Sequence, residues 1–574
     1  MRLPAVFLIL VIIVSGTARA REARITVLAT SDLHGNVLPW DYLSGEPVRR
    51  GLASIATIIN RERNSAPGAL LVDAGDTIQG APMETVWQTY VRTGKLPMNL
   101  RWDGPPPAID PMMLVMNHLR YDSMTLGNHE FNYGLANLER ARSEAKFPWL
   151  SANTKVPAGR KPFLPLIVRT VDGVKVGIIG VTTPGIPNWE KPENFRGYAF
   201  TNPRIAVAAA VSDLRSRRKA DIVIVVAHAG LDRDLTTGAQ HAGELADENM
   251  VYQLASEVPG IDAIVFGHTH SELGEAYVNG VLLTQPKNWG VSLARIDLVL
   301  EAKMDGSGWE VKSKHSRLIP VTPSIQPDAE VLRLAQPYHE VTERYLNSPV
   351  TRSAVAMSAS RSRVEDTPII DAIQTVQLHY ARADVSFTSS FNPRAEIPKG
   401  PVTVRQIAGL YIYDNELYAV EGNGRMVRDA LENAARYFVS CSEPSCSQGS
   451  LINRDFIGFN YDMAGGVSYV LDLMQPEGQR VRNLKFRGAP LADNQKLRLA
   501  LNSYRAAGSG GYTMFPKAPV VWRSFDDIRH LMIEYYAEHA LPAAADQNWK
   551  IVPERAREQL KREAHRLASR PETR

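Results

Sequence analysis

Seven residues of the types that hold metal ions stand in five short motifs, spread over more than two hundred positions. The motifs are Asp32-Leu33-His34, Gly75-Asp76, Gly127-Asn128-His129-Glu130, His228 and Gly267-His268-Thr269-His270. Carboxylate and amide oxygens together with imidazole nitrogens suit Mn, Zn, Fe or Co. Because the set contains no thiolate, it disfavours copper(I) and iron–sulfur clusters. The sequence therefore predicts a site for two divalent ions, and it leaves the identity of the metal open.

The seven residues divide into two sets that share Asp76. We assign one ion to Asp32, His34, Asp76 and His270, and the other to Asp76, Asn128, His228 and His268. A carboxylate has two oxygens and can bridge two cations, which an imidazole cannot, so Asp76 is the expected bridge. Considered alone, His228 is also consistent with a histidine packed in the core, and Asn128-His129 is also consistent with a turn. Five such motifs in this order favour the metal site.

Each motif follows an apolar run. Six runs have the length and the Val, Ile and Leu content of strands buried on both faces: residues 25–29, 69–72, 124–126, 174–181, 222–226 and 263–266. Helix-like stretches, such as 52–63 and 205–217, lie between several of them. This alternation predicts a layered α/β domain. Ligands of open α/β sheets bind at the carboxyl ends of the strands, so we expect the motifs to meet there.

A chain of 574 residues is too long for one ordinary domain. Apolar residues spaced at a helical period after Pro327 predict a linking helix, with Pro337 inside it. We expect five segments: a signal peptide at 1–20, the metal-binding domain at 21–322, the linker helix at 323–349, a second domain at 350–545, and a charged, fraying tail at 546–574.

The first twenty residues have the features of a secretory signal. Arg2 supplies the positive end, residues 6–14 are apolar, and Ala18-Arg19-Ala20 is a small-x-small cleavage site. An uncleaved anchor is the alternative, although residues 6–14 are short for a bilayer span. No later segment has about 18 unbroken apolar residues, so we expect no stable membrane span after cleavage. The predicted location is the periplasm or the exterior.

The two cysteines and the charge balance limit the other possibilities. In an oxidising compartment Cys441 and Cys446 can close a small disulfide loop, with free thiols as the alternative. The 65 basic and 61 acidic residues nearly cancel, so we expect no nucleic-acid polymer as partner. A small negatively charged substrate needs only a local positive site, which metal ions supply. Nothing indicates an oligomer, and a monomer is the default.

The metal motifs resemble those of the calcineurin-like metallophosphoesterases, and the second half resembles the C-terminal domain of secreted 5'-nucleotidases. Three segments look most like the periplasmic bifunctional 2',3'-cyclic-nucleotide 2'-phosphodiesterase/3'-nucleotidases: Gly127-Asn128-His129-Glu130-Phe131-Asn132-Tyr133-Gly134, Tyr411-Ile412-Tyr413-Asp414-Asn415 and Asn502-Ser503-Tyr504-Arg505-Ala506. The resemblance implies a four-layer α/β/β/α metallophosphoesterase domain, a linking helix and an α+β nucleoside-binding domain. It also implies a role in nucleotide catabolism: opening 2',3'-cyclic nucleotides to 3'-nucleotides and dephosphorylating 3'-nucleotides.

The resemblance also implies roles for six further residues. His129 is expected to stabilise phosphoryl charge or to protonate the departing sugar oxygen, and Asn132 to orient it, where 5'-nucleotidases have Asp. Four residues are expected to bind the nucleoside: Tyr413 and Tyr504 by stacking on the base, Arg394 by facing the ligand, and Asn415 by touching the base. Core packing is the alternative for either tyrosine, and a solvated surface position is the alternative for Arg394 and Asn415.

Three rival functions stay open. The first is a 5'-nucleotidase or UDP-sugar hydrolase on the same scaffold. Such enzymes grip the ribose diol with a Gly-Gly-Asp-Gly turn, and this chain has Gly508-Ser509-Gly510-Gly511, which is compatible with esterified 2' and 3' oxygens. The second is a sulfur-oxidation thiosulfohydrolase, which the paired tyrosines disfavour. The third is a catalytically silent nucleotide-binding protein, which the complete set of metal-type residues disfavours.

Overall fold

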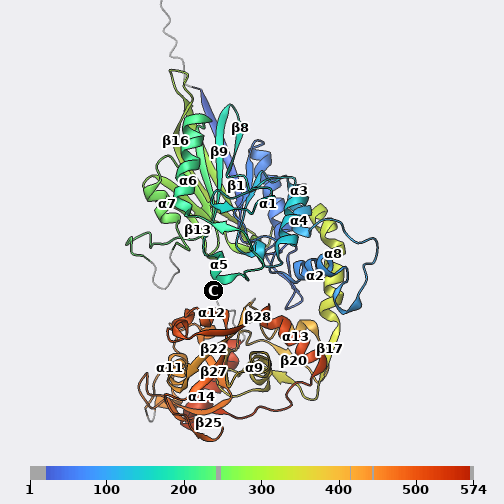
Figure 1. The fold of residues 1–574 in the computed structure, drawn as a ribbon, viewed down its shortest axis with the longest axis vertical. Coiled ribbons are helices and arrows are strands. Elements are labelled where there is room, and N and C mark those ends of the chain that lie inside the picture. Colours follow the sequence, from blue (N-terminus) through green and yellow to red (C-terminus); the bar gives the residue numbers. More distant parts are fainter. Residues whose placement is uncertain (1–20, 241–246, 414, 443–444, 569–574) are drawn as a thin grey trace, which may run out of the picture.

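The computed structural model describes residues 21–240, 247–413, 415–442 and 445–568, so the expected signal peptide lies outside the described residues. The chain forms two bodies, one above the other in Figure 1, that are joined on one side by helix α8 (Ala329–Asn347). Pro337 lies inside α8, which runs through the segment predicted as the linker. Among the described residues, no helix combines the length and the apolar composition that crossing a membrane requires.

Two six-stranded sheets form the centre of the first domain, in the orders β16-β15-β1-β4-β5-β6 and β13-β14-β12-β11-β9-β8. The first sheet contains β1 (Glu22–Thr30), β4 (Leu70–Asp73), β5 (Ser123–Thr125), β6 (Trp149–Leu150), β15 (Ser292–Ala302) and β16 (Trp309–Pro320). The second contains β8 (Leu166–Val171), β9 (Val174–Thr182), β11 (Ile222–His228), β12 (Ala263–Phe266), β13 (Leu273–Val278) and β14 (Val281–Gln285). The strands β1, β4, β5 and β6 are parallel, as are β9, β11, β12 and β14.

Successive side chains of each central strand point to opposite faces of its sheet. One face therefore packs against the other sheet, and the opposite face packs against helices. In β11, Ile222 and Ile224 lie in the core between the sheets, whereas Val223 and Val225 lie in the core under α6 (Pro203–Ser212) and α7 (Val251–Glu257). The outer face of the other sheet is covered by α1 (Leu52–Ser65), α2 (Pro82–Thr93), α3 (Pro111–Leu119) and α4 (Leu135–Glu144). This confirms the predicted four-layer α/β/β/α domain.

The second domain is α+β, as predicted. A five-stranded sheet contains, in order, β23 (Asp462–Gly465), β19 (Val385–Ser389), β27 (Lys496–Asn502), β22 (Glu416–Asn423) and β28 (Val520–Asp527). A four-stranded sheet contains β26 (Ala489–Pro490), β25 (Val481–Phe486), β24 (Val467–Asp472) and β29 (Trp549–Val552). Helices α9 (Pro368–Ala381), α11 (Gly424–Ala435) and α13 (Ile528–Glu538) bury their apolar residues in the same core.

Residues 546–568, the described part of the segment predicted as a charged, fraying tail, are instead integrated into the second domain. Strand β29 pairs in parallel with β24, and helix α14 (Glu554–Ala568) follows it. The side chains of Ala556, Leu560 and Ala564 are buried in the second-domain core. Their four-residue spacing forms an apolar stripe along an otherwise charged helix, so the average composition concealed a packed face.

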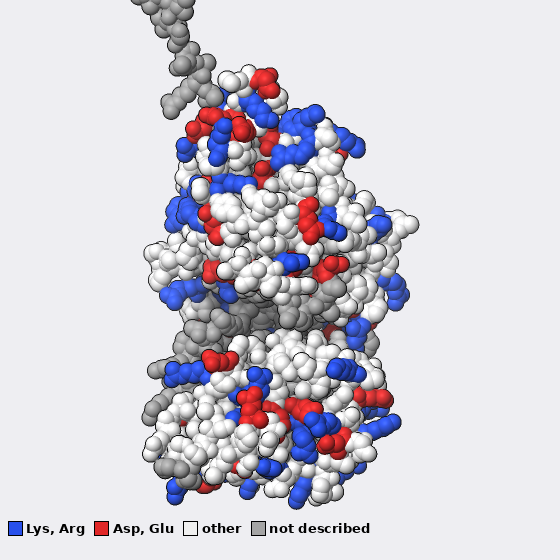
Figure 2. Space-filling model, turned by 90° about the vertical axis from the view of Figure 1, so that its left-hand side faces the viewer, with Lys and Arg blue, Asp and Glu red and all other residues white. Residues whose placement is uncertain are grey.

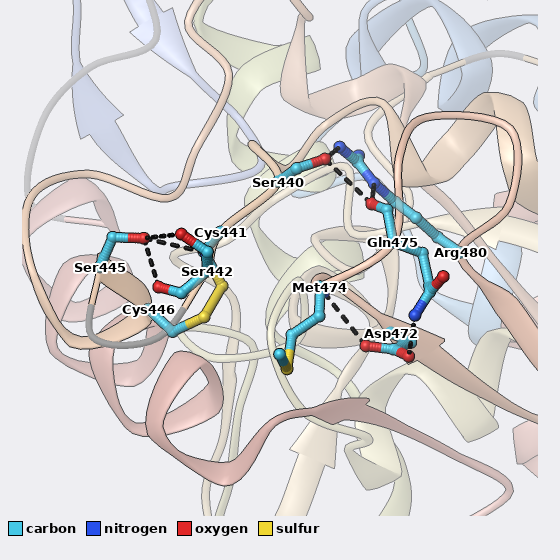
Figure 3. Close-up of a disulfide and its surroundings, with 9 residues drawn as sticks. All are labelled: Ser440, Cys441, Ser442, Ser445, Cys446, Asp472, Met474, Gln475 and Arg480. Carbon is cyan, nitrogen blue, oxygen red and sulfur yellow. Dashed lines mark hydrogen bonds between the residues drawn. A yellow bond between two sulfur atoms is a disulfide. The ribbon is translucent and has the colours of Figure 1, made fainter.

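Cys441 and Cys446 are joined by a disulfide, as the sequence predicted for an oxidising compartment. Both cysteines are buried. Within the loop that they close, the Ser445 hydroxyl donates to the carbonyl of Ser442 (2.5 Å) and accepts from the Ser442 N–H (2.9 Å) (Figure 3). These hydrogen bonds hold the two flanks of the short loop together beside the disulfide.

Charges of both signs are mixed on the surface. Figure 2 shows Lys and Arg side chains interspersed with Asp and Glu over both lobes of the face that it draws. This mixture agrees with the near balance of basic and acidic residues in the sequence. On this face, any attraction for a small anion must therefore come from a local arrangement of groups.

Three carboxylates lie together in the second domain. Asp366, Asp371 and Asp546 each place one oxygen within 4.8 Å of the others. Burial, followed by repulsion from the neighbouring carboxylates, raises the pKa of Asp366 from 3.8 to about 7 and that of Asp371 to about 6. A carboxyl with a raised folded-state pKa holds its proton more tightly when folded, so stability is full below the unfolded pKa and is lost as the pH rises toward the folded value.

We therefore expect Asp366→Asn to remove part of the pH dependence of stability. Between pH 5 and pH 8 the wild type should lose about 1 kcal/mol of unfolding free energy that the variant keeps, after allowance for solvent screening of a half-exposed group. Urea unfolding at the two pH values measures the difference. Asp455→Asn, at an exposed position, is the control. Equal losses in wild type and Asp366→Asn would contradict the assignment.

Candidate metal centre

The structure brings all seven predicted residues together at one edge of the two sheets. His228 is the last residue of β11, and the other six lie in the loops that follow β1, β4, β5 and β12: Asp32, His34, Asp76, Asn128, His268 and His270. These strands run in parallel within their sheets, so their carboxyl ends deliver the side chains to the same edge.

The side chains form two adjacent groups with Asp76 between them. One group is Asp32, His34 and His270, the other is Asp76, His228 and His268, and within each group one donor atom per residue lies within 4.8 Å of the rest. The Asn128 Oδ1 atom lies 2.9 Å from His228 Nε2 and 3.1 Å from His268 Nδ1. The Asp76 Oδ2 atom lies 3.0 Å from His228 Nε2 and 3.9 Å from His34 Nε2.

Backbone carbonyls fix which ring nitrogen of two histidines faces the site. His34 Nδ1 donates to the carbonyl of Gln79 (2.9 Å), and His228 Nδ1 donates to that of Ala74 (2.8 Å). The Nε2 lone pair of His34 therefore faces His270 Nε2 at 3.0 Å. Burial, more than any other cause, lowers the pKa of both His34 and His270 to about 4, so both rings are neutral at physiological pH. Neutral imidazoles with converging lone pairs are suited to a cation.

The second group favours positive charge at its centre. Burial alone lowers the pKa of His228, but the Asp76 carboxylate outweighs burial and raises that pKa to about 10. Burial likewise opposes ionisation of Asp76, while His228 and His129 hold its pKa well below the usual range. The carboxylate of Asp76 and the amide oxygen of Asn128 thus converge where a positive charge is stabilised. These donors fit a divalent ion in each group.

Five of the seven residues have left-handed backbone conformations. The φ angles are 50° at Asp32, 47° at His34, 58° at Asp76, 75° at His268 and 54° at His270. Such conformations are unfavourable for residues with a side chain, and they persist where the surrounding structure enforces them. The loops are also packed closely: a Cβ atom on Gly267 would overlap the Ser31 hydroxyl oxygen. The site is therefore shaped by strained, tightly fitted loops.

The Glu130 carboxylate links two of these loops through hydrogen bonds to their backbones. It is fully buried, and it accepts hydrogen bonds from the backbone N–H groups of Asp76 (3.1 Å), Thr77 (2.6 Å) and Gly127 (2.7 Å). The loop that carries Asp76 is thereby held against the loop that carries Asn128.

His129 lies beside the first group and is the start of a chain of hydrogen bonds. Its ring centroid is 5.2 Å from that of His34, and its Nδ1 atom lies 2.6 Å from Asn132 Oδ1. Asn132 Nδ2 in turn donates to Glu190 Oε2 (2.8 Å). Burial raises the pKa of Glu190 above its usual value, and hydrogen bonds from Lys191 and Asn194 and the nearby His129 offset only part of this effect.

Sequence reasoning missed three residues that contact the candidate site. Glu190 follows the short helix α5 (Ile186–Trp189), and Trp189 packs on the ring of His268 at a centroid distance of 5.4 Å. Glu248 Oε1 lies 3.2 Å from His268 Nε2. None of the three stands in a motif or at a strand end, so their positions follow from tertiary contacts alone.

The two predicted base-stacking tyrosines lie in the second domain. The Tyr413 ring packs edge-on against Phe391 and Phe459, at centroid distances of 5.4 and 6.2 Å. The Tyr504 ring is 41% exposed, and the Arg505 guanidinium lies 5.2 Å from its centre. Arg505 also donates to the carbonyl of Phe459 (2.7 Å), which connects the surroundings of both rings.

The other two predicted substrate residues lie in the neighbouring loops. Arg394 is exposed, and its backbone N–H donates to Asn392 in the loop that follows Phe391. Asn415 is half-buried, and its side chain donates to the Tyr411 hydroxyl at 3.4 Å.

The two domains meet near these elements. In Figure 1, α12 (Ser503–Ala506), which carries Tyr504, faces α5 of the first domain. Burial raises the pKa of Glu416 in the second domain to about 7, and Lys191 and Glu190 of the first domain are among the charges that act on it. On the side of the linking helix, Arg405 pairs with Glu343 of α8 (2.7 Å) and also donates to the carbonyl of Tyr42.

Comparison with known proteins agrees with this architecture. Residues 25–272 match the calcineurin-like phosphoesterase family model, and residues 325–517 match that of the 5'-nucleotidase C-terminal domain. The 2',3'-cyclic-nucleotide 2'-phosphodiesterase/3'-nucleotidase of Salmonella typhimurium is 30% identical over an alignment that covers 95% of this chain and 91% of that relative. The chain belongs to the calcineurin-like phosphoesterases that carry a 5'-nucleotidase C-terminal domain. This confirms the family and the enzyme class predicted from the motifs.

Two further comparisons extend this result. The phosphoesterase is 30% identical to the trifunctional nucleotide phosphoesterase protein YfkN of Bacillus subtilis over 93% of its own length, and it spans 39% of that longer relative. Among solved structures, one described as a 5'-nucleotidase from Staphylococcus aureus matches with a TM-score of 0.73 and 27% identity, over 92% of this chain and 100% of that one. The match covers both domains, so the two-domain arrangement is shared.

Proposed function

We propose that this phosphoesterase is a nucleotide hydrolase with two divalent ions. It opens 2',3'-cyclic nucleotides to 3'-nucleotides and removes the phosphate of 3'-nucleotides. The observation that carries the proposal is the position of Asp76 between two groups of converging donors. The substrate follows the activity named for the Salmonella typhimurium relative, which aligns over nearly the whole chain.

The residues that would hold the ions are those of the two groups. Asp32, His34, Asp76 and His270 surround one position, and Asp76, Asn128, His228 and His268 surround the other. Divalent ions of the Mn, Zn, Co or Fe type suit these oxygen and nitrogen donors. When bound, such ions neutralise charge on a phosphoryl group and lower the pKa of water at the site.

His129 is the residue that we assign to the reacting phosphate. Because its Nδ1 atom faces Asn132, its Nε2 atom is left for the substrate. From there it stabilises charge on the phosphoryl group or protonates the departing sugar oxygen. A well-placed general acid contributes a factor of about 10² to 10⁴ to the rate.

The second domain supplies the nucleoside site. Tyr413 and Tyr504 stack on the base, and Arg394 and Asn415 lie in the adjoining loops. The exposed face of Tyr504 supports this role, because its ring is braced by Arg505 and stays accessible. Stacking tolerates any base, so we expect little discrimination among bases.

We expect Tyr504→Ala to weaken nucleotide binding with little effect on the phosphate chemistry. The KM for 2',3'-cyclic AMP should rise about 5- to 150-fold, which corresponds to about 1–3 kcal/mol of base stacking. Turnover of bis-p-nitrophenyl phosphate, which has no base, should stay within about twofold of wild type, because Tyr504 lies in the second domain and all seven donors lie in the first. Tyr504→Phe is the matched control and should bind as the wild type does. An equal loss on both substrates would show that Tyr504 does not bind the base.

Comparison of three substrates tests the proposed function. The enzyme is supplied with Mn²⁺, and kcat/KM is measured for 2',3'-cyclic AMP, 3'-AMP and 5'-AMP. The proposal expects the first two to be preferred. A preference for 5'-AMP would instead indicate that the enzyme is a 5'-nucleotidase. Retention of two metal ions per chain without any turnover would indicate a nucleotide-binding protein.

We further propose that the enzyme acts in the periplasm or outside the cell, as a monomer. The signal-like pattern of residues 1–20 and the disulfide between Cys441 and Cys446 support export. Fractionation of cells that produce the full chain, followed by mass analysis of the mature N-terminus, tests the location.

A further inference from the structure

A buried carboxylate, that of Glu190, is hydrogen-bonded to Asn132 of the His129–Asn132 pair. Glu190 is 3% exposed and accepts three N–H hydrogen bonds. Asn132 Nδ2 donates to its Oε2 atom at 2.8 Å, and the Lys191 backbone N–H (2.6 Å) and Asn194 Nδ2 (2.9 Å) donate to its Oε1 atom. With donors on both oxygens, the carboxylate acts only as an acceptor.

This arrangement determines which way the Asn132 amide points. An amide has a donating NH₂ end and an accepting oxygen end. The carboxylate of Glu190 requires the NH₂ end, so the oxygen end is turned toward His129 Nδ1, 2.6 Å away. His129 must then carry a hydrogen on Nδ1, and Nε2 is presented to the substrate. A ring that donates from Nε2 to the phosphoryl group or to the departing sugar oxygen carries hydrogen on both nitrogens, and the Asn132 oxygen accommodates that form. An aspartate at position 132 would accept this hydrogen in either orientation, whereas an asparagine needs a third group to select one.

We propose that Glu190 is a positioning residue for the hydrolysis reaction, which orients the Asn132 amide and thereby holds a hydrogen-bond acceptor against Nδ1 of His129. The inference rests on the proposed function, because it assigns Glu190 to the same site. It extends the His129–Asn132 pair to a three-residue chain that begins on the turn after α5, the helix that faces the second domain in Figure 1. Glu190 acts through Asn132 and does not contact the substrate.

Glu190→Gln tests the proposal with almost no change in shape. The Lys191 N–H and Asn194 Nδ2 still require an oxygen where Oε1 lies, so the new NH₂ group occupies the Oε2 position and faces Asn132. The Asn132 amide then turns over and presents its NH₂ end to His129 Nδ1, which must accept and carries no hydrogen. The ring is thereby kept from the doubly protonated form that gives a proton to the departing sugar oxygen from Nε2. We expect kcat for 2',3'-cyclic AMP to fall about 10- to 100-fold, with a much smaller change in KM.

A second substitution is expected to rescue the first. Asn132→Asp in the Glu190→Gln background restores an acceptor toward His129 and supplies another toward the new amide at position 190. Asn132→Asp alone brings a second carboxylate against the buried carboxylate of Glu190 and should also be slow. The double variant is expected to exceed either single variant in kcat by about tenfold, a coupling in the range seen for directly contacting residues. A role of Glu190 in folding alone predicts a double variant no faster than the slower single variant.

Controls separate this inference from the proposed function. Glu193→Gln makes the same chemical change at an exposed position of the same segment and should leave kcat unchanged. Metal analysis should show two ions per chain in every variant. Nitrogen NMR of the zinc-loaded, ¹⁵N-histidine protein, assigned with His129→Gln, should show hydrogen on Nδ1 of His129 in wild type and double variant, and its loss in Glu190→Gln.

Failure of the inference about Glu190 and failure of the proposed function give different experimental results. If Glu190→Gln keeps both the kcat and the His129 nitrogen signals of wild type, the inference is overturned and the proposed function stands. If the wild type hydrolyses none of the three nucleotides but the nitrogen signals change as expected, the proposed function fails and the positioning role stands.

Discussion

Replacing Asp76 with alanine is expected to reduce kcat/KM for 2',3'-cyclic AMP by about 10³-fold or more. The Asp76 carboxylate lies between the two groups of donors, with Oδ2 at 3.0 Å from His228 Nε2 and 3.9 Å from His34 Nε2. Its loss removes a donor from both positions at once, and metal-based charge stabilisation is worth several kcal/mol at about 1.4 kcal/mol per tenfold. Steady-state kinetics with added Mn²⁺ measures the change.

Metal content gives an independent measure of the same substitution. We expect two ions per chain in the wild type and one or fewer in Asp76→Ala, because the shared ligand serves both positions. Asp305→Ala, at an exposed position of the first domain, is the control for the general effect of removing a carboxylate. Full hydrolytic rate or full metal content in Asp76→Ala would refute the shared site.

Arg505→Met is expected to destabilise the second domain by about 3–5 kcal/mol, because it leaves a buried charge without its partner. Arg505 is fully buried and forms a two-pronged pair with Asp462 at 2.7 and 2.9 Å. It also donates to Asn460 Oδ1 and to the carbonyl of Phe459. The midpoint of urea unfolding measures the loss.

A paired substitution distinguishes the unpaired charge from a packing defect. Arg505→Met combined with Asp462→Leu replaces both ions with apolar groups, and such replacements of buried pairs are often neutral. Most of the lost stability should therefore return in the double variant. If the double variant unfolds as early as Arg505→Met, packing around the guanidinium and not the charge of Asp462 accounts for the loss.

The core strands of the first domain were predictable because both of their faces are buried. Runs 25–29 and 222–226, for example, are almost wholly apolar and correspond to β1 and β11. The edge strand β16 gave no such signal, since its residues are mostly exposed or half-exposed and its sequence is rich in Lys, Arg and Ser. The buried face of helix α14 was not predicted, because three small or apolar residues at four-residue spacing are easily masked by the surrounding charges.

The candidate metal centre was predictable for a related reason. Each of its residues stands at or just after the end of a strand, so recognising the strands was sufficient to bring Asp32, Asp76 and His268 together. Glu190 lies 58 residues from Asn132, on a turn that no local pattern marks. Its position depends on how α5 packs against the sheets, and a single sequence carries no record of that contact.

The left-handed backbone at five of the seven donors has a consequence for how cations enter and leave. These unfavourable conformations are imposed when the polypeptide folds, by the close packing of loops such as that around Gly267. Entry of a cation therefore requires little rearrangement of the chain, and its departure leaves the donors in place. We expect the enzyme to survive removal of its ions by a chelator without unfolding, and different divalent ions to replace one another in the same rigid frame.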